Sequence, residues 1–162
     1  MSQSTAKNLV SGIVSVVLIA FVAYNNYDSG KHVKAFNAYI AAVKPQLVAQ
    51  DQILAEVQQT KDADCAAKVD DWIKRSDAIT AAFEAQALGE PDVAAMNQDL
   101  VSRSTLLSEG LRMLKEVAEG GFKDEAKGKA IADKRQQADQ KLNDFVAKRD
   151  AYFKKHDMKL KK

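Results

Sequence analysis

The sequence predicts an all-α protein in which a single N-terminal transmembrane helix precedes an antiparallel, up-down-up-down four-helix bundle or a set of long helical hairpins. Three observations support this fold class. An uncharged run of 20 residues lies near the N-terminus. After it, apolar residues recur three and four positions apart, and no alternating run of β-branched or aromatic residues occurs. Turn-forming residues then divide the remaining chain into four pieces of similar length.

The first element is the uncharged run at residues 8–27, which follows a short stub at residues 1–7. As a helix it would extend about 30 Å, the thickness of the hydrocarbon core of a bilayer. Tyr24 and Tyr27 would then contact the lipid headgroups. A cleaved signal peptide is the alternative interpretation, but the best cleavage point, after Ala23, places the large Phe21 where a small residue is needed. We therefore expect an uncleaved anchor.

The charges that flank this anchor do not strongly specify its orientation in the membrane. Lys7 precedes the apolar run, and Lys31 and Lys34 follow it, so the positive-inside rule alone is nearly neutral. A short N-terminal stub before a first apolar helix is typical of a signal anchor with its N-terminus in the cytoplasm. This predicts a single-pass protein of the bacterial inner membrane, with its helical domain in the periplasm.

Two helices are predicted in the first half of the domain at residues 28–156. The helix at about 31–60 carries a coiled-coil-like apolar stripe that is interrupted only by Gln50, and Pro45 predicts a kink near residues 41–44. The helix at about 62–88 continues the same spacing, with the small polar Ser76 inside the stripe. Asp62 or Asp64 is expected to cap its N-terminus.

Two further helices are predicted at about 92–119 and 123–156. Pro91 favours a helix start, and Gly120 with Gly121 favours a left-handed cap where the third helix ends. The fourth helix has few large apolar residues in its first half, so we expect that end of the bundle to fray first. Residues 157–162 form a basic tail.

The composition argues against most catalytic chemistry. One cysteine excludes a disulfide framework or a multi-cysteine metal site, and the net charge of +2 argues against nucleic-acid binding. There is no CxxCH, ExxH or GK[ST] motif. Cys65 lies in an apolar stripe, where we expect an inert thiol. We predict no enzyme, no catalytic residue and no cofactor.

His32 and His156 are the candidates for a haem or metal site, together with Met96 and Met113 as further haem ligands. An up-down-up-down bundle would bring His32 close to Tyr152 and His156 at the membrane-proximal end. We nevertheless expect two solvated surface histidines, because their sequence surroundings are polar, and we expect the methionines to pack in the core.

Two features suggest contacts outside the domain. Trp72 is expected in the core, with an interface anchor as the alternative. The C-terminal residues 148–162 carry a net charge of +5, which favours an anionic lipid surface or simply a solvated end. The lysines predicted to contact the membrane are Lys154, Lys155, Lys159, Lys161 and Lys162.

The function expected from this organisation is that of a non-catalytic, membrane-anchored helical scaffold or accessory subunit of a cell-envelope complex. Its partners would be the lipid bilayer and other membrane or envelope proteins, in an oligomeric state that the sequence leaves open. The alternatives are a ligand- or haem-binding extracytoplasmic bundle and a lipid-binding rod.

Overall fold

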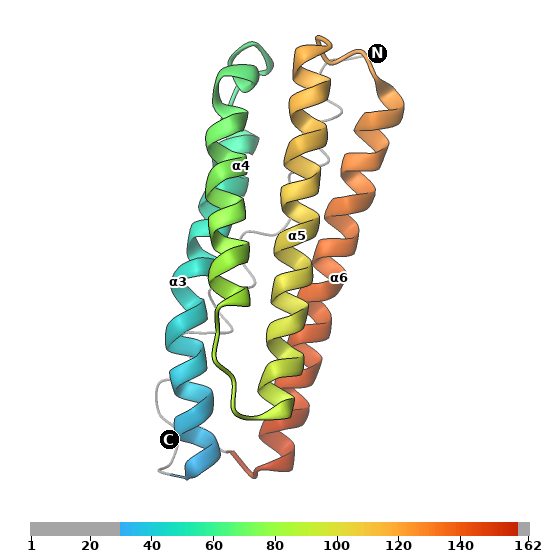
Figure 1. The fold of residues 1–162 in the computed structure, drawn as a ribbon. Helices are drawn as coiled ribbons and strands as arrows, with labels where there is room; N and C mark the ends of the chain where they lie inside the picture. The colour runs from blue at the N-terminus through green and yellow to red at the C-terminus, as the bar shows by residue number, and fades with distance from the viewer. Residues whose placement is uncertain (1–29, 159–162) are drawn as a thin grey trace.

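The structure, a computed structural model, describes residues 30–158, and within that range it is all helical (Figure 1). Its four helices are α3 (Lys31–Gln59), α4 (Asp62–Glu84), α5 (Pro91–Glu119) and α6 (Glu125–Lys155). They run alternately up and down and are joined by short connections. The all-α class is therefore confirmed for these residues, and the arrangement is that of a four-helix bundle.

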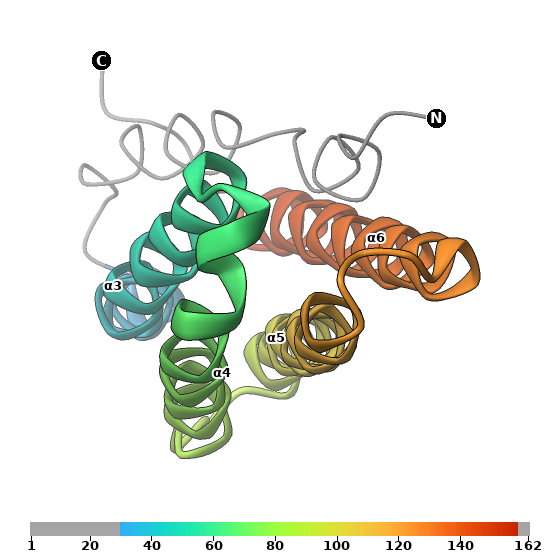
Figure 2. The same ribbon diagram turned by 90° about the horizontal axis from the view of Figure 1, so that it is seen from above.

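Neighbours in sequence are also neighbours in space. Helix α4 packs on α3, α5 on α4, and α6 on α5. The end-on view in Figure 2 shows α3 and α6 at the two ends of this series. No Cα atom of α3 lies within 8 Å of one of α6. Contact between these two helices therefore depends on side chains, and the aromatic rings at one end of the bundle provide it.

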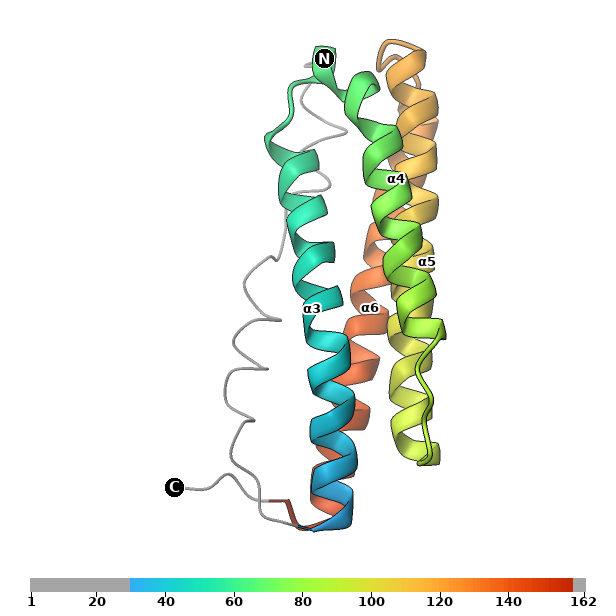
Figure 3. The same ribbon diagram turned by 60° about the vertical axis from the view of Figure 1, so that its left-hand side comes forward.

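The core is formed by the apolar stripes that the sequence shows. Each helix turns its three-and-four-spaced apolar residues inward, because burying these stripes together removes them from water. Large side chains from all four helices are fully buried, among them Phe36, Trp72, Phe83, Met96 and Phe145. Figure 3 shows the α3–α4 connection and the α5–α6 connection at the same end of the bundle. The α4–α5 loop lies at the opposite end.

Helix α4 ends four residues earlier than expected, at Glu84 instead of Leu88. The side-chain amide of Asn97 on α5 donates a 2.8 Å hydrogen bond to the carbonyl of Phe83. This bond satisfies one of the acceptors that every helix leaves unpaired at its C-terminus. The chain can therefore leave the helix there and cross to Pro91.

The expected N-cap of α4 is wrong. Lys61 occupies the cap position without a side-chain hydrogen bond, and Asp62 and Asp64 both lie inside the first turn. There the negative charges of both carboxylates still interact favourably with the positive end of the helix dipole. Asp124 does cap α6, since its Oδ1 accepts the backbone N–H of Lys127 at 3.0 Å.

The left-handed turn predicted after the third helix is confirmed. Gly121 has φ of +71°, and the N–H of Phe122 donates to the carbonyl of Val117 at 2.8 Å. This is the long-range bond of a Schellman-type ending. Helix α3 runs through Pro45 without interruption.

Within residues 30–158, none of the helices combines the length and apolar character needed to cross a bilayer. The predicted anchor at residues 8–27 lies outside the described residues, as do Tyr24 and Tyr27.

Candidate functional site at the α3, α5 and α6 ends

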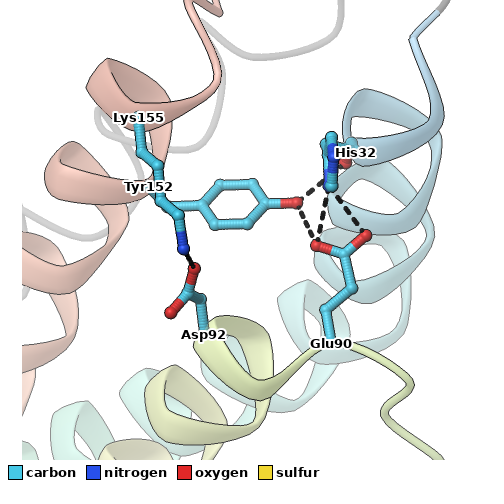
Figure 4. A network of polar contacts seen from close by, with 5 residues as sticks. All are labelled: His32, Glu90, Asp92, Tyr152 and Lys155. Atoms are coloured by element: carbon cyan, nitrogen blue, oxygen red, sulfur yellow. Dashed lines mark hydrogen bonds and ion pairs between the residues drawn. The ribbon is translucent and has the colours of Figure 1, made fainter.

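A cluster of polar and aromatic side chains joins three helices at one end of the bundle. It comprises His32, Glu90, Tyr152 and His156, with the Asp92–Lys155 ion pair beside it (Figure 4 shows all but His156). We call this group the end cluster. Its members are separated by up to 124 positions in sequence, so only the folded bundle brings them together.

Each residue of the end cluster is positioned by the start or the end of a helix. His32 lies in the first turn of α3, Glu90 is the N-cap residue of α5, and His156 is the C-cap residue of α6. Pro91 occupies the first turn of α5, where its fixed φ and missing N–H suit a helix start. This places the side chain of Glu90 just outside the helix, where it faces α3 and α6.

The side chains converge closely. Nδ1 of His32 lies 3.1 Å from both carboxylate oxygens of Glu90. The hydroxyl of Tyr152 lies 2.7 Å from Glu90 Oε2 and 3.1 Å from the main-chain carbonyl of His32. The rings of His32 and His156 stack with their centroids 3.8 Å apart. One carboxylate thus accepts hydrogen bonds from side chains of two different helices.

The electrostatics favour a charged Glu90. The hydrogen bond from Tyr152 lowers the pKa of the Glu90 carboxyl, and that of His32 lowers it further. Burial and the same hydrogen bond raise the pKa of Tyr152, which therefore stays a protonated donor. His32 is half exposed, at 46%, whereas the side chain of Glu90 is only 19% exposed. The cluster is open to solvent on the His32 side.

The predicted juxtaposition of His32 with Tyr152 and His156 is confirmed. The histidines were expected to be solvated surface residues, and His32 is exposed whereas His156 is half-buried. Their rings nevertheless stack on each other and contact Tyr152, which the sequence did not predict. Glu90 was missed by sequence reasoning. The available signal was its place in the Gly89-Glu90-Pro91 breaker, which an up-down-up-down bundle puts at the same end as His32.

A haem pocket does not fit this cluster. Axial histidines would lie on opposite faces of the porphyrin, whereas these two rings stack directly on each other. Met96 is fully buried, and Met113 packs against the core. Both methionines therefore have the packing role that was expected of them.

Trp72 is a core residue, with 1% of its surface exposed. Its indole N–H donates to Glu56 Oε2 on α3 at 3.0 Å. The alternative role as an exposed interface anchor is not supported, since the ring is inaccessible. Cys65 is fully buried, as expected of an inert thiol.

Two of the proposed lipid-contacting lysines fall within the described residues. Lys154 is exposed, whereas Lys155 forms a 2.6 Å ion pair with Asp92. Lys159, Lys161 and Lys162 lie outside the described residues.

A second polar group, inside the bundle, was also missed by sequence reasoning. Arg103 on α5 is 1% exposed, donates to Gln50 Oε1 and lies 3.6 Å from the carboxylate of Asp51. Ser104 accepts a bond from the Gln50 amide at 3.1 Å. This layer links α3 to α5 in mid-bundle, and its burial gives it no opening to a substrate.

Comparison of the chain with protein-family models, curated proteins and solved structures gives no match. The function is therefore argued from the residues themselves.

Proposed function

We propose that this protein is a non-catalytic, membrane-anchored helical scaffold or accessory subunit of a cell-envelope complex. One observation carries the proposal. A 20-residue uncharged segment at positions 8–27 leads almost directly into α3, the first helix of a bundle whose interior is filled by its own side chains. Such a body would stand on the bilayer and present its outer surface to partners.

The outer surface of the bundle supports this role. Ion pairs connect adjacent helices along its length, including Arg112 with Asp77 at 2.7 Å and Lys134 with Glu109 at 2.6 Å. Single exposed pairs contribute little to stability, at most about 1 kcal/mol. They do, however, give a rigid, hydrated surface of mixed charge that suits reversible contacts between proteins.

Membrane attachment is tested by alkaline carbonate extraction of the full chain. We expect it to stay with the membrane pellet. A Val17→Arg/Ala20→Arg variant should be released, since each arginine at the centre of a spanning helix costs about 3 kcal/mol. The matched control is Ala67→Arg, because Ala67 is exposed on α4 and the same residue type is introduced. Release of the unmodified chain would contradict the anchor.

The scaffold role is tested by chemical crosslinking in intact membranes followed by purification and mass spectrometry. We expect defined envelope proteins to be crosslinked to residues of α3 to α6. A chain that is recovered alone, at native expression, would count against a scaffold. The visible spectrum of the same sample separates this role from the haem-binding alternative, since a Soret band would favour the latter.

A further inference from the structure

The end cluster contains a set of groups that matches a transition-metal site. His32, Glu90 and His156 each offer one ligand atom, and these three atoms all lie within 4.8 Å of one another. Two imidazoles and one carboxylate form a ligand set that proteins use for Zn²⁺, with a fourth position left for water. The three residues come from three different helix ends, so the fold itself creates this set.

The separations are close to those that coordination requires. With metal–ligand bonds of about 2.1 Å, the ligand atoms of a tetrahedral site are about 3.4 Å apart. His32 Nδ1 and the Glu90 oxygens are already 3.1 Å apart. The ring of His156 stacks on that of His32 with a centroid separation of 3.8 Å, and its ligand nitrogen lies within 4.8 Å of the other two ligand atoms. Binding would therefore draw His156 closer to the carboxylate.

The local charge favours a dication. Glu90 and Asp92 place two carboxylates at this end, and Lys155 offsets one of them through its 2.6 Å pair with Asp92. The C-terminus of α6 adds a negative partial charge next to His156, whereas the N-termini of α3 and α5 add positive ones, each of about half an elementary charge. The remaining carboxylate is Glu90, which has no lysine or arginine paired with it among the ion pairs of the described residues.

Glu90 is also held in place by a neighbour that is not a ligand. The Tyr152 hydroxyl lies 2.7 Å from Oε2 and fixes that oxygen. Hydrogen bonds of this kind orient the carboxylates of metal sites and raise metal affinity. Tyr152 is itself buried between Phe36 and Phe153, which makes it a rigid support.

From this geometry we propose that His32, Glu90 and His156 bind one Zn²⁺ ion. The ion connects α3 to α5 and α6 at the end of the bundle where α3 begins. In sequence, this end comes directly after the predicted anchor. The ion would bridge two helices of which no Cα atoms lie within 8 Å of each other, α3 and α6. A bound ion would link a side chain at the start of α3 to one at the end of α6. This link would add to the hydrogen bonds that already connect these helices in the end cluster.

Isothermal titration of the full-length chain in detergent, with Zn²⁺ alone, tests the proposal. Any polyhistidine tag must be removed, because the chain has only two histidines. We expect one ion per chain and a rise in the thermal midpoint. His32→Ala, His156→Ala and Glu90→Gln should each weaken Zn²⁺ binding by at least about tenfold. Co²⁺ in place of Zn²⁺ should give the visible absorption of a tetrahedral site.

Asp92→Asn and Glu109→Gln are the matched controls. Each removes one carboxylate while leaving the three ligands intact. Asp92→Asn should weaken binding only slightly, through charge, and Glu109→Gln not at all. Zn²⁺ affinity that is unchanged in His32→Ala, or absent from the unmodified chain at millimolar Zn²⁺, would overturn the proposal. So would Zn²⁺-dependent dimerisation in sedimentation velocity, since the ligands would then come from two chains.

Discussion

The guanidinium of Arg103 on α5 lies 3.6 Å from the carboxylate of Asp51 on α3, and both side chains are buried inside the bundle. Burial raises the pKa of Asp51 despite the attraction of Arg103 and Arg135. The pKa of Arg103 is lowered, again mainly by burial. For both groups burial is therefore the largest influence, ahead of the attraction between them.

This balance predicts how Asp51→Asn changes stability with pH. A carboxyl whose pKa is raised on folding stabilises the native state while it is protonated, and this stabilisation is lost as the pH rises through the folded-state pKa. The variant lacks this titration, so we expect the stability of the parent relative to the variant to fall between pH 4 and pH 7. Urea unfolding followed by the fluorescence of Trp72, the only tryptophan, measures both values. If the parent instead gained stability relative to the variant over this range, the ion pair would prevail over desolvation.

Removing the cation should destabilise the protein at pH 7. Arg103→Met leaves Gln50 Oε1 without its donor and Asp51 without its nearest positive charge. We expect a loss of about 3 kcal/mol at pH 7, typical of a broken buried pair, and a smaller loss as the pH falls and Asp51 takes up a proton. The double variant Arg103→Met/Asp51→Asn should recover part of the loss. Additive effects of the two substitutions in a double-mutant cycle would contradict this coupling.

The hydroxyls of Ser76 and Ser108 form another buried pair, 2.7 Å apart, between α4 and α5. Ser76→Ala removes the partner of a buried hydroxyl, and we expect it to cost about 1 to 2 kcal/mol. Ser76→Ala/Ser108→Ala removes both hydroxyls and should be no less stable than the single variant, since no polar group is then left unpaired. Chemical denaturation of the two variants tests this order of stability.

The sequence predicts the fold well because four apolar stripes have a helical period and can be buried together in few ways. It predicts helix starts and ends less well. At the end of α4 the carbonyl of Phe83 accepts a hydrogen bond from Asn97, which is 14 positions away and gives no local signal in the sequence. Helix α4 begins at Asp62, as expected, but the N-cap expected at Asp62 or Asp64 rested on residue preference alone, and Lys61 occupies that position.

The same limit applies to the end cluster. The up-down-up-down order places His32 beside Tyr152 and His156, since it fixes which helix ends meet. It does not show that Glu90 accepts hydrogen bonds from both His32 and Tyr152, because that depends on side-chain directions at three helix ends. Likewise, Arg103 looks like a surface residue in sequence. Its burial becomes apparent only in the folded bundle, where it contacts Gln50 and Asp51 of α3 inside the core.

The turn between α5 and α6 gives a prediction with an internal control. Gly121 has φ of +71°, a conformation in which a Cβ is unfavourable, so Gly121→Ala should cost about 1 kcal/mol. Gly89 has an ordinary φ and open space around the position of a Cβ. Gly89→Ala should therefore leave stability unchanged or raise it by about 0.5 kcal/mol, because it restricts the unfolded chain. Both values follow from urea unfolding monitored by Trp72 fluorescence. Equal effects at the two glycines would mean that the left-handed turn contributes nothing to how α5 ends.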